Sequence, residues 1–140
     1  MGVLHTLTNL WQNKRQNLHG DLEESRSQVE TERKGNLVIL SLSGAIISGI
    51  DEDDLKVALD QIVKDGIFRI VVNLERARWL NSSAFGILIA AQNQVRMQGG
   101  CVHLVRPNQR IISVFITMHL EKLFNRYETL DEAIAAFDAV

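Results

Sequence analysis

The segment WLNSSAFG (residues 79–86) lies where an apolar, strand-like run gives way to an amphipathic helix. It places two adjacent hydroxyls, those of Ser82 and Ser83, at the start of that helix. A helix N-terminus carries unpaired backbone N–H groups and the positive end of the helix dipole, so it can hold an added phosphate. The segment therefore predicts a position at which a covalent modification could act as a switch.

Strand-like and helix-like segments alternate on both sides of this point. Short apolar runs predict strands at 37–42, 67–74 and 101–105, with a further short strand at 126–128 and an antiparallel partner for the first at 28–33. Apolar residues at helical spacing predict helices over 55–63, 85–95, 107–124 and 130–137. We therefore expect an α/β domain with a mixed, mostly parallel sheet of four to five strands and about four helices packed on it.

Length and composition agree with a single small domain. The chain has 140 residues, of which 46% are hydrophobic and 23% charged, enough to bury one core but not two. A net charge of −2 gives no general attraction to nucleic acid. The sequence has neither an apolar run long enough to span a bilayer nor a secretory pattern, so we expect a cytoplasmic protein.

The sequence offers little support for enzymatic chemistry. The lone Cys101 falls inside a predicted strand, the four histidines show no metal-like spacing, and His103 and His119 are isolated. The Gly-x-Ser-x-Gly turn of hydrolases and the glycine loops that bind phosphate are both absent from the sequence. We therefore expect no catalytic residue, no metal and no cofactor.

Several motifs, taken in order, carry a resemblance to a known family. They are Leu-Ser-Gly at 42–44, Val-Asn-Leu at 72–74, Asn-Ser-Ser-Ala-Phe-Gly at 81–86, Gln-Gly-Gly at 98–100, and Leu-Phe at 123–124 followed by Thr-Leu-Asp-Glu-Ala at 129–133. With this order and spacing, residues 25–140 resemble a STAS domain, the fold of bacterial anti-sigma factor antagonists. The resemblance implies a single STAS-like domain.

The same resemblance implies a non-enzymatic protein that acts by partner switching. Such a domain binds an anti-sigma factor that is also a serine kinase; phosphorylation of a serine at the start of the second helix then separates the two. Ser82 is the position that matches this acceptor, and a phosphatase is a further partner that the mechanism allows. The surrounding residues depart from the family pattern Asp-Ser-Ser-Gly, because Asn81 replaces Asp and Ala84 replaces Gly.

Two alternatives remain open for this site. Ser82 could serve only as a helix cap, with Asn81 sharing that role, and Ser83 is better explained as structural. The second alternative is a STAS subunit of a membrane transport complex, such as a lipid-transport ATPase, that binds its partner without phosphorylation. The altered motif and a basic N-terminal segment are the features that favour it.

Candidate partner-binding residues come from apolar positions that the sheet does not obviously need. Ile111, Val114 and Met118 form a second stripe on the predicted helix after Pro107, and Phe85 lies beside the double serine. A wide, core-facing helix surface would explain the same pattern. We therefore expect these four residues either to contact a partner or to belong to the core.

Two charged segments remain. Residues 1–24 combine apolar positions at helical spacing with Lys14, Arg15 and His19, which predicts an amphipathic or partly disordered N-terminal extension. It could contact a membrane, mediate a dimer or pack on the domain, and the oligomeric state stays open. The acidic run at 51–54 precedes a predicted helix, where we expect it to be solvated.

Overall fold

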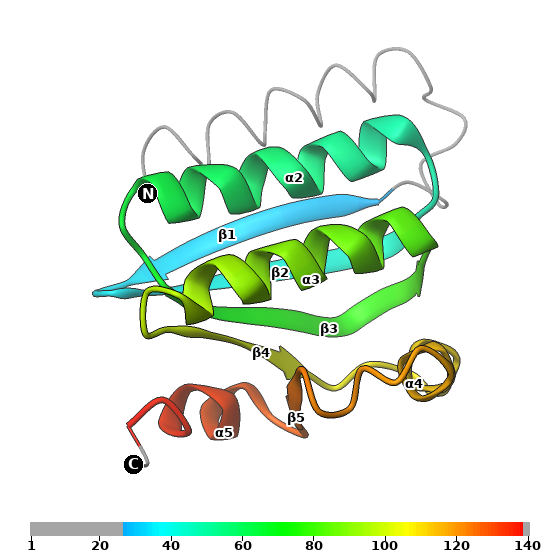
Figure 1. The fold of residues 1–140 in the computed structure, drawn as a ribbon. Coiled ribbons are helices and arrows are strands. Elements are labelled where there is room, and N and C mark those ends of the chain that lie inside the picture. The colour runs from blue at the N-terminus through cyan, green and yellow to red at the C-terminus, as the bar shows by residue number, and fades with distance from the viewer. Residues whose placement is uncertain (1–26, 139–140) are drawn as a thin grey trace.

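The computed structural model describes residues 27–138, which form a five-stranded sheet covered by helices (Figure 1). The strands are β1 (Gln28–Lys34), β2 (Leu37–Ile46), β3 (Arg69–Leu80), β4 (Cys101–Val105) and β5 (Asn125–Tyr127). The helices are α2 (Gly49–Lys64), α3 (Ser82–Arg96), α4 (Gln109–Thr117) and α5 (Leu130–Ala135). The predicted N-terminal extension, residues 1–24, lies outside the described residues.

The strands follow one another across the sheet in the order β1-β2-β3-β4-β5. β1 and β2 pair antiparallel through a tight turn, with Lys34 opposite Leu37 and Gly35 in the left-handed region at φ 62°. Every other neighbouring pair is parallel. The expectation of a mixed, mostly parallel sheet is confirmed, and so is the antiparallel pairing of its first two strands.

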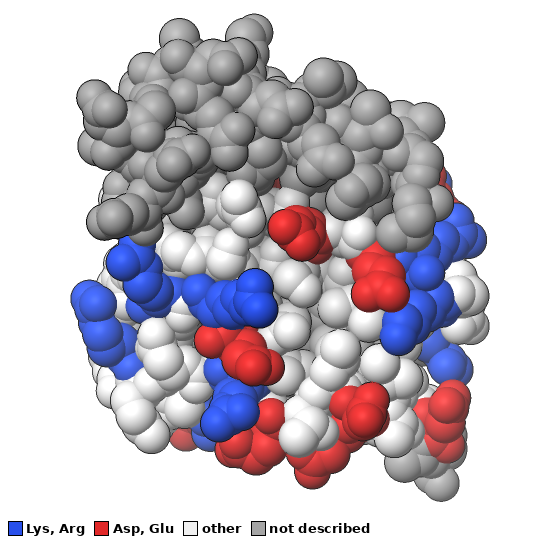
Figure 2. Space-filling model, turned by 180° about the vertical axis from the view of Figure 1, so that it is seen from behind, with Lys and Arg blue, Asp and Glu red and all other residues white. Residues whose placement is uncertain are grey.

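Helices cover both faces of the sheet (Figure 1). α2, α3 and α4 enclose the main core on one face, where Phe85 and Phe115 meet edge to face at 5.2 Å between ring centroids. α5 covers part of the other face, where Ala133 packs with Ile39 and Val71. On the side of the molecule seen in Figure 2, the described residues present basic and acidic side chains interspersed with neutral ones.

Local capping explains where the helices begin. Ser48 and Thr129 each form a capping box, with Asp51 and Glu132 respectively. Asn81 and Asn108 cap α3 and α4 by accepting a backbone N–H three residues on. The Thr-x-x-Glu spacing at 129–132 predicts such a capping box from the sequence, and the structure confirms it.

α4 is shorter than predicted. The expected helix over 107–124 ends at Thr117, because Met118 is its C-cap and His119 adopts the left-handed conformation at φ 58°. Its core-facing residues are Ile111 and Phe115, one turn apart. The apolar spacing of this segment predicts that both Phe115 and Ile116 face the sheet; Phe115 is buried, but Ile116 is exposed, so the predicted phase was wrong at that position.

The acidic run also differs from expectation. Asp51 and Asp54 are buried rather than solvated, whereas Asp53 is exposed. Asp51 faces the start of β1, where the Ser27 hydroxyl donates to its carboxylate. Asp51, a member of this run, therefore joins the start of α2 to the residue that precedes β1.

Candidate functional site

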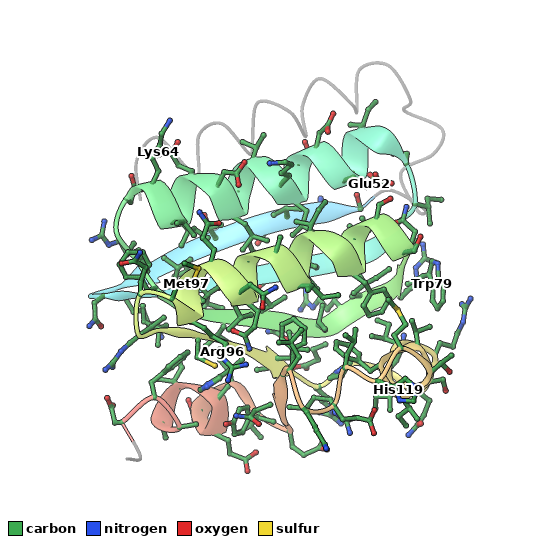
Figure 3. The ribbon with its side chains drawn as sticks, in the orientation of Figure 1. Glu52, Lys64, Trp79, Arg96, Met97 and His119 are labelled. Carbon is green, nitrogen blue, oxygen red and sulfur yellow. The ribbon has the colours of Figure 1, made fainter. Side chains whose placement is uncertain are left out.

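The double serine lies at the end of the sheet where β2 and β3 finish and α2 and α3 begin. The backbone N–H of Asn81 donates to the Ile46 carbonyl at 3.0 Å, which ties the end of β3 to the end of β2. Figure 3 shows Glu52 and Trp79 at this end of the molecule, with Lys64 and Met97 at the opposite end. The parallel strands thus bring the N-termini of two helices together.

Asn81 is the residue that organises this junction. Its Oδ1 accepts the Ala84 N–H at 2.9 Å, which caps α3, and its Nδ2 donates to Glu52 Oε2 at 2.7 Å. Both polar ends of the amide are therefore used, one within α3 and one toward α2. Asn81 was expected among the surroundings of the acceptor serine, but its contact with Glu52 was not.

Ser82 and Ser83 occupy the first two positions of α3, and both are exposed. Since Asn81 is the N-cap, the alternative that Ser82 acts as the helix cap is wrong. Within residues 27–138 neither serine hydroxyl makes a hydrogen bond. The Ser82 hydroxyl is thus accessible and uncommitted, next to backbone N–H groups that have no partner inside the helix.

The next two residues face the other way. Ala84 and Phe85 are buried in the main core. The methyl group that distinguishes Ala84 from the glycine of the family pattern therefore contacts the core and not a partner. Of the two alternatives for Phe85, the structure places it in the core, because its ring packs against Phe115.

For the second apolar stripe predicted on α4, the structure likewise favours the core-facing alternative at two of its three residues. Ile111 is fully buried and Val114 packs against the main core, so these two residues hold the helix to the sheet. Met118 alone among the four proposed partner-binding residues is substantially exposed, at 40%. The exposed apolar side chains beside the double serine are instead Ile47, at 59%, and Ile50, at 42%, at the start of α2.

A buried carboxylate fixes the loop that carries Ile47. Asp51 accepts the N–H groups of Ile47 and Ser48, each at 3.1 Å, in addition to the Ser27 hydroxyl. Burial raises the pKa of Asp51, but these hydrogen bonds to the charged form outweigh it, so the pKa lies below its ordinary 3.8. Asp51 therefore remains ionised at neutral pH and holds the start of α2 in place.

α4 is joined to the same end of the sheet. Asn108 Nδ2 donates to the carbonyls of Ala77 and Arg78 in β3, at 3.2 and 3.0 Å. The Arg110 guanidinium lies over the Trp79 ring, 4.8 Å from its centroid. Three capped helix N-termini, those of α2, α3 and α4, are therefore attached to the ends of β2 and β3.

A shallow groove of about 350 Å³ runs between α2 and α3 away from this junction. Ser83 and Gly86 line it on α3, and Lys56 and Asp60 line it on α2, where they form an ion pair at 2.9 Å. The groove begins beside the double serine. It makes the facing surfaces of α2 and α3 accessible from solvent.

The histidine and the cysteine of β4 are both at least partly buried in the packed domain. His103 is buried, with Nδ1 donating to the Ala133 carbonyl at 2.9 Å, and Cys101 is partly buried in β4. Between residues 27 and 138, no three His, Cys, Asp or Glu side chains are grouped so that they could hold a metal ion. None of the helices in that range is long and apolar enough to cross a membrane.

The comparison with protein families agrees with this architecture. The sequence model of one family, the STAS domain, matches residues 28–133. The chain belongs to the STAS domain family. A candidate anti-sigma factor antagonist of Thermotoga neapolitana is 27% identical over 79 residues, which cover 56% of this STAS chain and 70% of the relative.

Solved structures show the same fold. An anti-sigma factor antagonist from Mycobacterium paratuberculosis superposes with a TM-score of 0.72 at 24% identity, over 81% of this chain and 96% of that one. The antagonist SpoIIAA matches in its unphosphorylated form (TM-score 0.66, 19% identity, 82% and 100% coverage) and, from Bacillus, in its phosphorylated form (0.64, 20%, 77% and 97%). The expected single STAS-like α/β domain is therefore confirmed.

Two residues that organise this junction of the STAS domain were not recognised from sequence. Glu52 was interpreted as part of a solvated acidic run, and its bond to Asn81 joins positions 29 residues apart, which no local pattern encodes. Asp51 did leave a signal, because Ser48-x-x-Asp51 has the spacing of a capping box. That spacing could have identified the start of α2.

Proposed function

We propose that this STAS domain is an anti-sigma factor antagonist that acts by partner switching, with Ser82 as its phosphate acceptor. Family membership and the similar antagonists support the first part. The observation that carries the second is the exposed Ser82 hydroxyl at the first position of α3, left free of capping by Asn81. The partner is an anti-sigma factor with serine kinase activity.

In this mechanism the chain is the substrate of the kinase and not a catalyst. The Ser82 oxygen attacks the γ-phosphorus of ATP held by the partner, its proton passes to a base of the kinase, and the bond to the leaving ADP breaks. The phosphoserine oxygens then face the N–H groups of the first turn of α3, which favour negative charge. A phosphatase returns the serine by hydrolysis.

Phosphorylation would act on the partner surface without unfolding the domain. It adds about 1.5 to 2 negative charges at pH 7. Because Ile47 and Ile50 expose apolar surface at the same end of the molecule, a partner that buries them would also have to desolvate the phosphate. The phosphorylated form of SpoIIAA has the same fold, which supports the view that a phosphate can be added while the domain stays folded.

Capture and phosphorylation with the native partner test the proposal. Wild type, Ser82→Glu and Ser82→Ala, with Ser83→Ala as the matched control, are used to retain proteins from the native cell lysate. Each retained complex is then incubated with ATP and the chain is mapped by mass spectrometry. We expect wild type and Ser83→Ala to retain an anti-sigma factor with a kinase fold, to gain one phosphate on Ser82 and to release the partner.

Three results would contradict the proposal. One is retention of the same kinase by Ser82→Glu and wild type with equal affinity. Another is phosphate that appears only on Ser83 or on no serine. The third is recovery of a transport ATPase or permease by all variants alike, which would establish the membrane transport alternative.

A further inference from the structure

The contact between Glu52 and Asn81 links the modification site to the neighbouring helix. Asn81 uses one end of its amide to cap α3 and the other, 2.7 Å from Glu52 Oε2, to hold the first turn of α2. Glu52 is half-buried and forms no ion pair among residues 27–138. Its negative charge at this junction is therefore balanced only by the Asn81 amide and by helix N-termini.

The residue after Asn81 is the proposed phosphate acceptor. The first turn of α3 contains no acidic residue, so Glu52 brings a carboxylate to this helix start from outside the helix. Lys56, one turn further along α2, is paired with Asp60. A phosphate on Ser82 would thus add negative charge one residue away from the amide that holds the Glu52 carboxylate.

The first turn of α2 also carries part of the exposed apolar surface. Ile50 lies two residues before Glu52, and Ile47 lies in the preceding loop, where Asp51 holds its N–H. A displacement of Glu52 would therefore move this turn relative to α3. The bond between Glu52 and Asn81 therefore connects the turn that carries Ile50 to the start of α3.

We propose that Glu52 senses the modification state of Ser82: a phosphate there repels Glu52, breaks its hydrogen bond to Asn81 and releases the first turn of α2 from α3. This inference rests on the proposed function, because it takes Ser82 as the acceptor. It adds a second effect to the charge of the phosphate itself. The apolar surface at Ile47 and Ile50 changes shape when Ser82 is modified.

A double-mutant cycle on the isolated chain, without any partner, tests this coupling. Phosphoserine is installed at position 82 by genetic code expansion, in wild type and in Glu52→Gln. Gln keeps an oxygen that can accept from Asn81, so the variant retains the hydrogen bond and loses only the charge. Asp53→Asn is the matched control, because Asp53 is an exposed acid in the same turn with no contact to Asn81.

Two quantities are measured, the unfolding equilibrium constant in urea and the NMR signals of the Asn81 side-chain amide and of Ile50. In wild type we expect repulsion by Glu52 to outweigh the attraction of the α3 N–H groups, so that phosphoserine 82 raises the unfolding constant about threefold to tenfold and shifts both signals. In Glu52→Gln most of the increase and the Ile50 shift should disappear. In Asp53→Asn they should persist.

Equal effects of Glu52→Gln and Asp53→Asn would overturn the inference, since the coupling would then be a general response to net charge. An unfolding constant that phosphoserine 82 leaves unchanged in wild type would also overturn it. Neither result depends on a kinase or a sigma factor. Failure of the proposed function would instead be seen in the capture experiment, so the two failures are distinguishable.

Discussion

Asn81 shows how one amide can join two elements through two separate atoms. A cap needs an acceptor for the N–H three residues on, and Glu52 needs a donor; Asn carries these groups on Oδ1 and Nδ2, whereas a serine would have to use one hydroxyl oxygen for both. Aspartate, which the family pattern places here, could cap the helix but would face Glu52 with a second negative charge. Asn81, which departs from the family pattern, therefore suits the neighbouring Glu52 because it is neutral and donates a hydrogen bond to it.

Substitutions at Asn81 should separate these two roles. Asn81→Ala removes both and should lower the free energy of unfolding by about 1–2 kcal/mol. Asn81→Asp keeps the cap but loses the donor, and should lower it by about 1 kcal/mol through repulsion by the half-buried Glu52. Urea denaturation at pH 7 measures both.

The double variant Asn81→Asp with Glu52→Gln is the control, because Gln can donate to the new carboxylate. It should recover most of the lost stability. A double variant no more stable than Asn81→Asp alone would show that the contact contributes nothing to folding.

Asp51 should give the start of α2 a pH-dependent stability. Its pKa is lowered in the folded state, so its contribution is fully present above the unfolded value near 3.8 and is lost as pH falls through the lower folded value. Asp51→Asn should lower the free energy of unfolding by about 1.5–3 kcal/mol at pH 7, because hydrogen bonds to a charged acceptor are lost.

Urea denaturation at pH 7, 5 and 3.5 tests this, with Asp53→Asn as the exposed control. The difference between wild type and Asp51→Asn should be constant from pH 7 to 5 and shrink below pH 3.8. A difference that stays the same at pH 3.5 would mean that the Asp51 charge does not stabilise the fold.

Among the elements, those with local signals could be predicted and those fixed by distant contacts could not. The hairpin turn after Lys34, the capping box at Thr129 and the strand from Cys101 to Val105 each have their determinants within a few residues. The phase of α4 was predicted wrongly because apolar residues 120–124 were counted as helical, although they reach the core from the loop beyond Thr117.

In the candidate site, too, the features with a local sequence signal could be predicted and those fixed by distant contacts could not. Its position at the start of α3 follows from the strand-to-helix change, which the sequence displays. Phe85 and Ile111 are buried because of how α3 and α4 pack on the sheet. The apolar spacing of the sequence alone does not tell a residue that faces the core from one that faces a partner. Glu52 could not be assigned because its partner lies in another element.

Two glycines in and after α3 should respond in opposite ways to the same substitution. Gly86 lies inside the helix, and an added Cβ would meet nothing within 4 Å. Gly86→Ala should therefore raise the free energy of unfolding by about 0.5–1 kcal/mol through helix propensity. Gly100 precedes β4, and an added Cβ would lie 1.9 Å from the Phe68 carbonyl oxygen.

Gly100→Ala must push the start of β4 away from β3, and should lower the free energy of unfolding by about 2–3 kcal/mol. Thermal and urea denaturation of the two variants in parallel check both signs. A stabilised Gly100→Ala or a destabilised Gly86→Ala would contradict the described packing of α3 and β4.

In the molecule as a whole, two cores on opposite faces of one sheet share the stability, and the smaller contains a titratable group. His103 stacks on Phe137 with 3.9 Å between ring centroids and bonds to Ala133, which attaches α5 to the sheet. Burial lowers the pKa of His103 more than the bond to the Ala133 carbonyl raises it. Protonation of His103 therefore opposes folding.

The stability of the whole domain should fall as pH drops below 6.5, the ordinary pKa of histidine, and level off below the lower folded value. His103→Phe should remove this part of the pH dependence, whereas His119→Gln, at an exposed position, should leave it. Urea denaturation between pH 7.5 and 5.5 measures the slope. The same slope in wild type and His103→Phe would refute the assignment.

The strand order has a consequence for how the protein is made. Each strand pairs with the one synthesised just before it, so no early strand waits for a late one to fill a gap in the sheet. Contacts close in sequence cost little loop entropy and form quickly. A nascent chain can therefore pair each new strand with the one made before it, and the main core closes once Phe115 of α4 packs against Phe85.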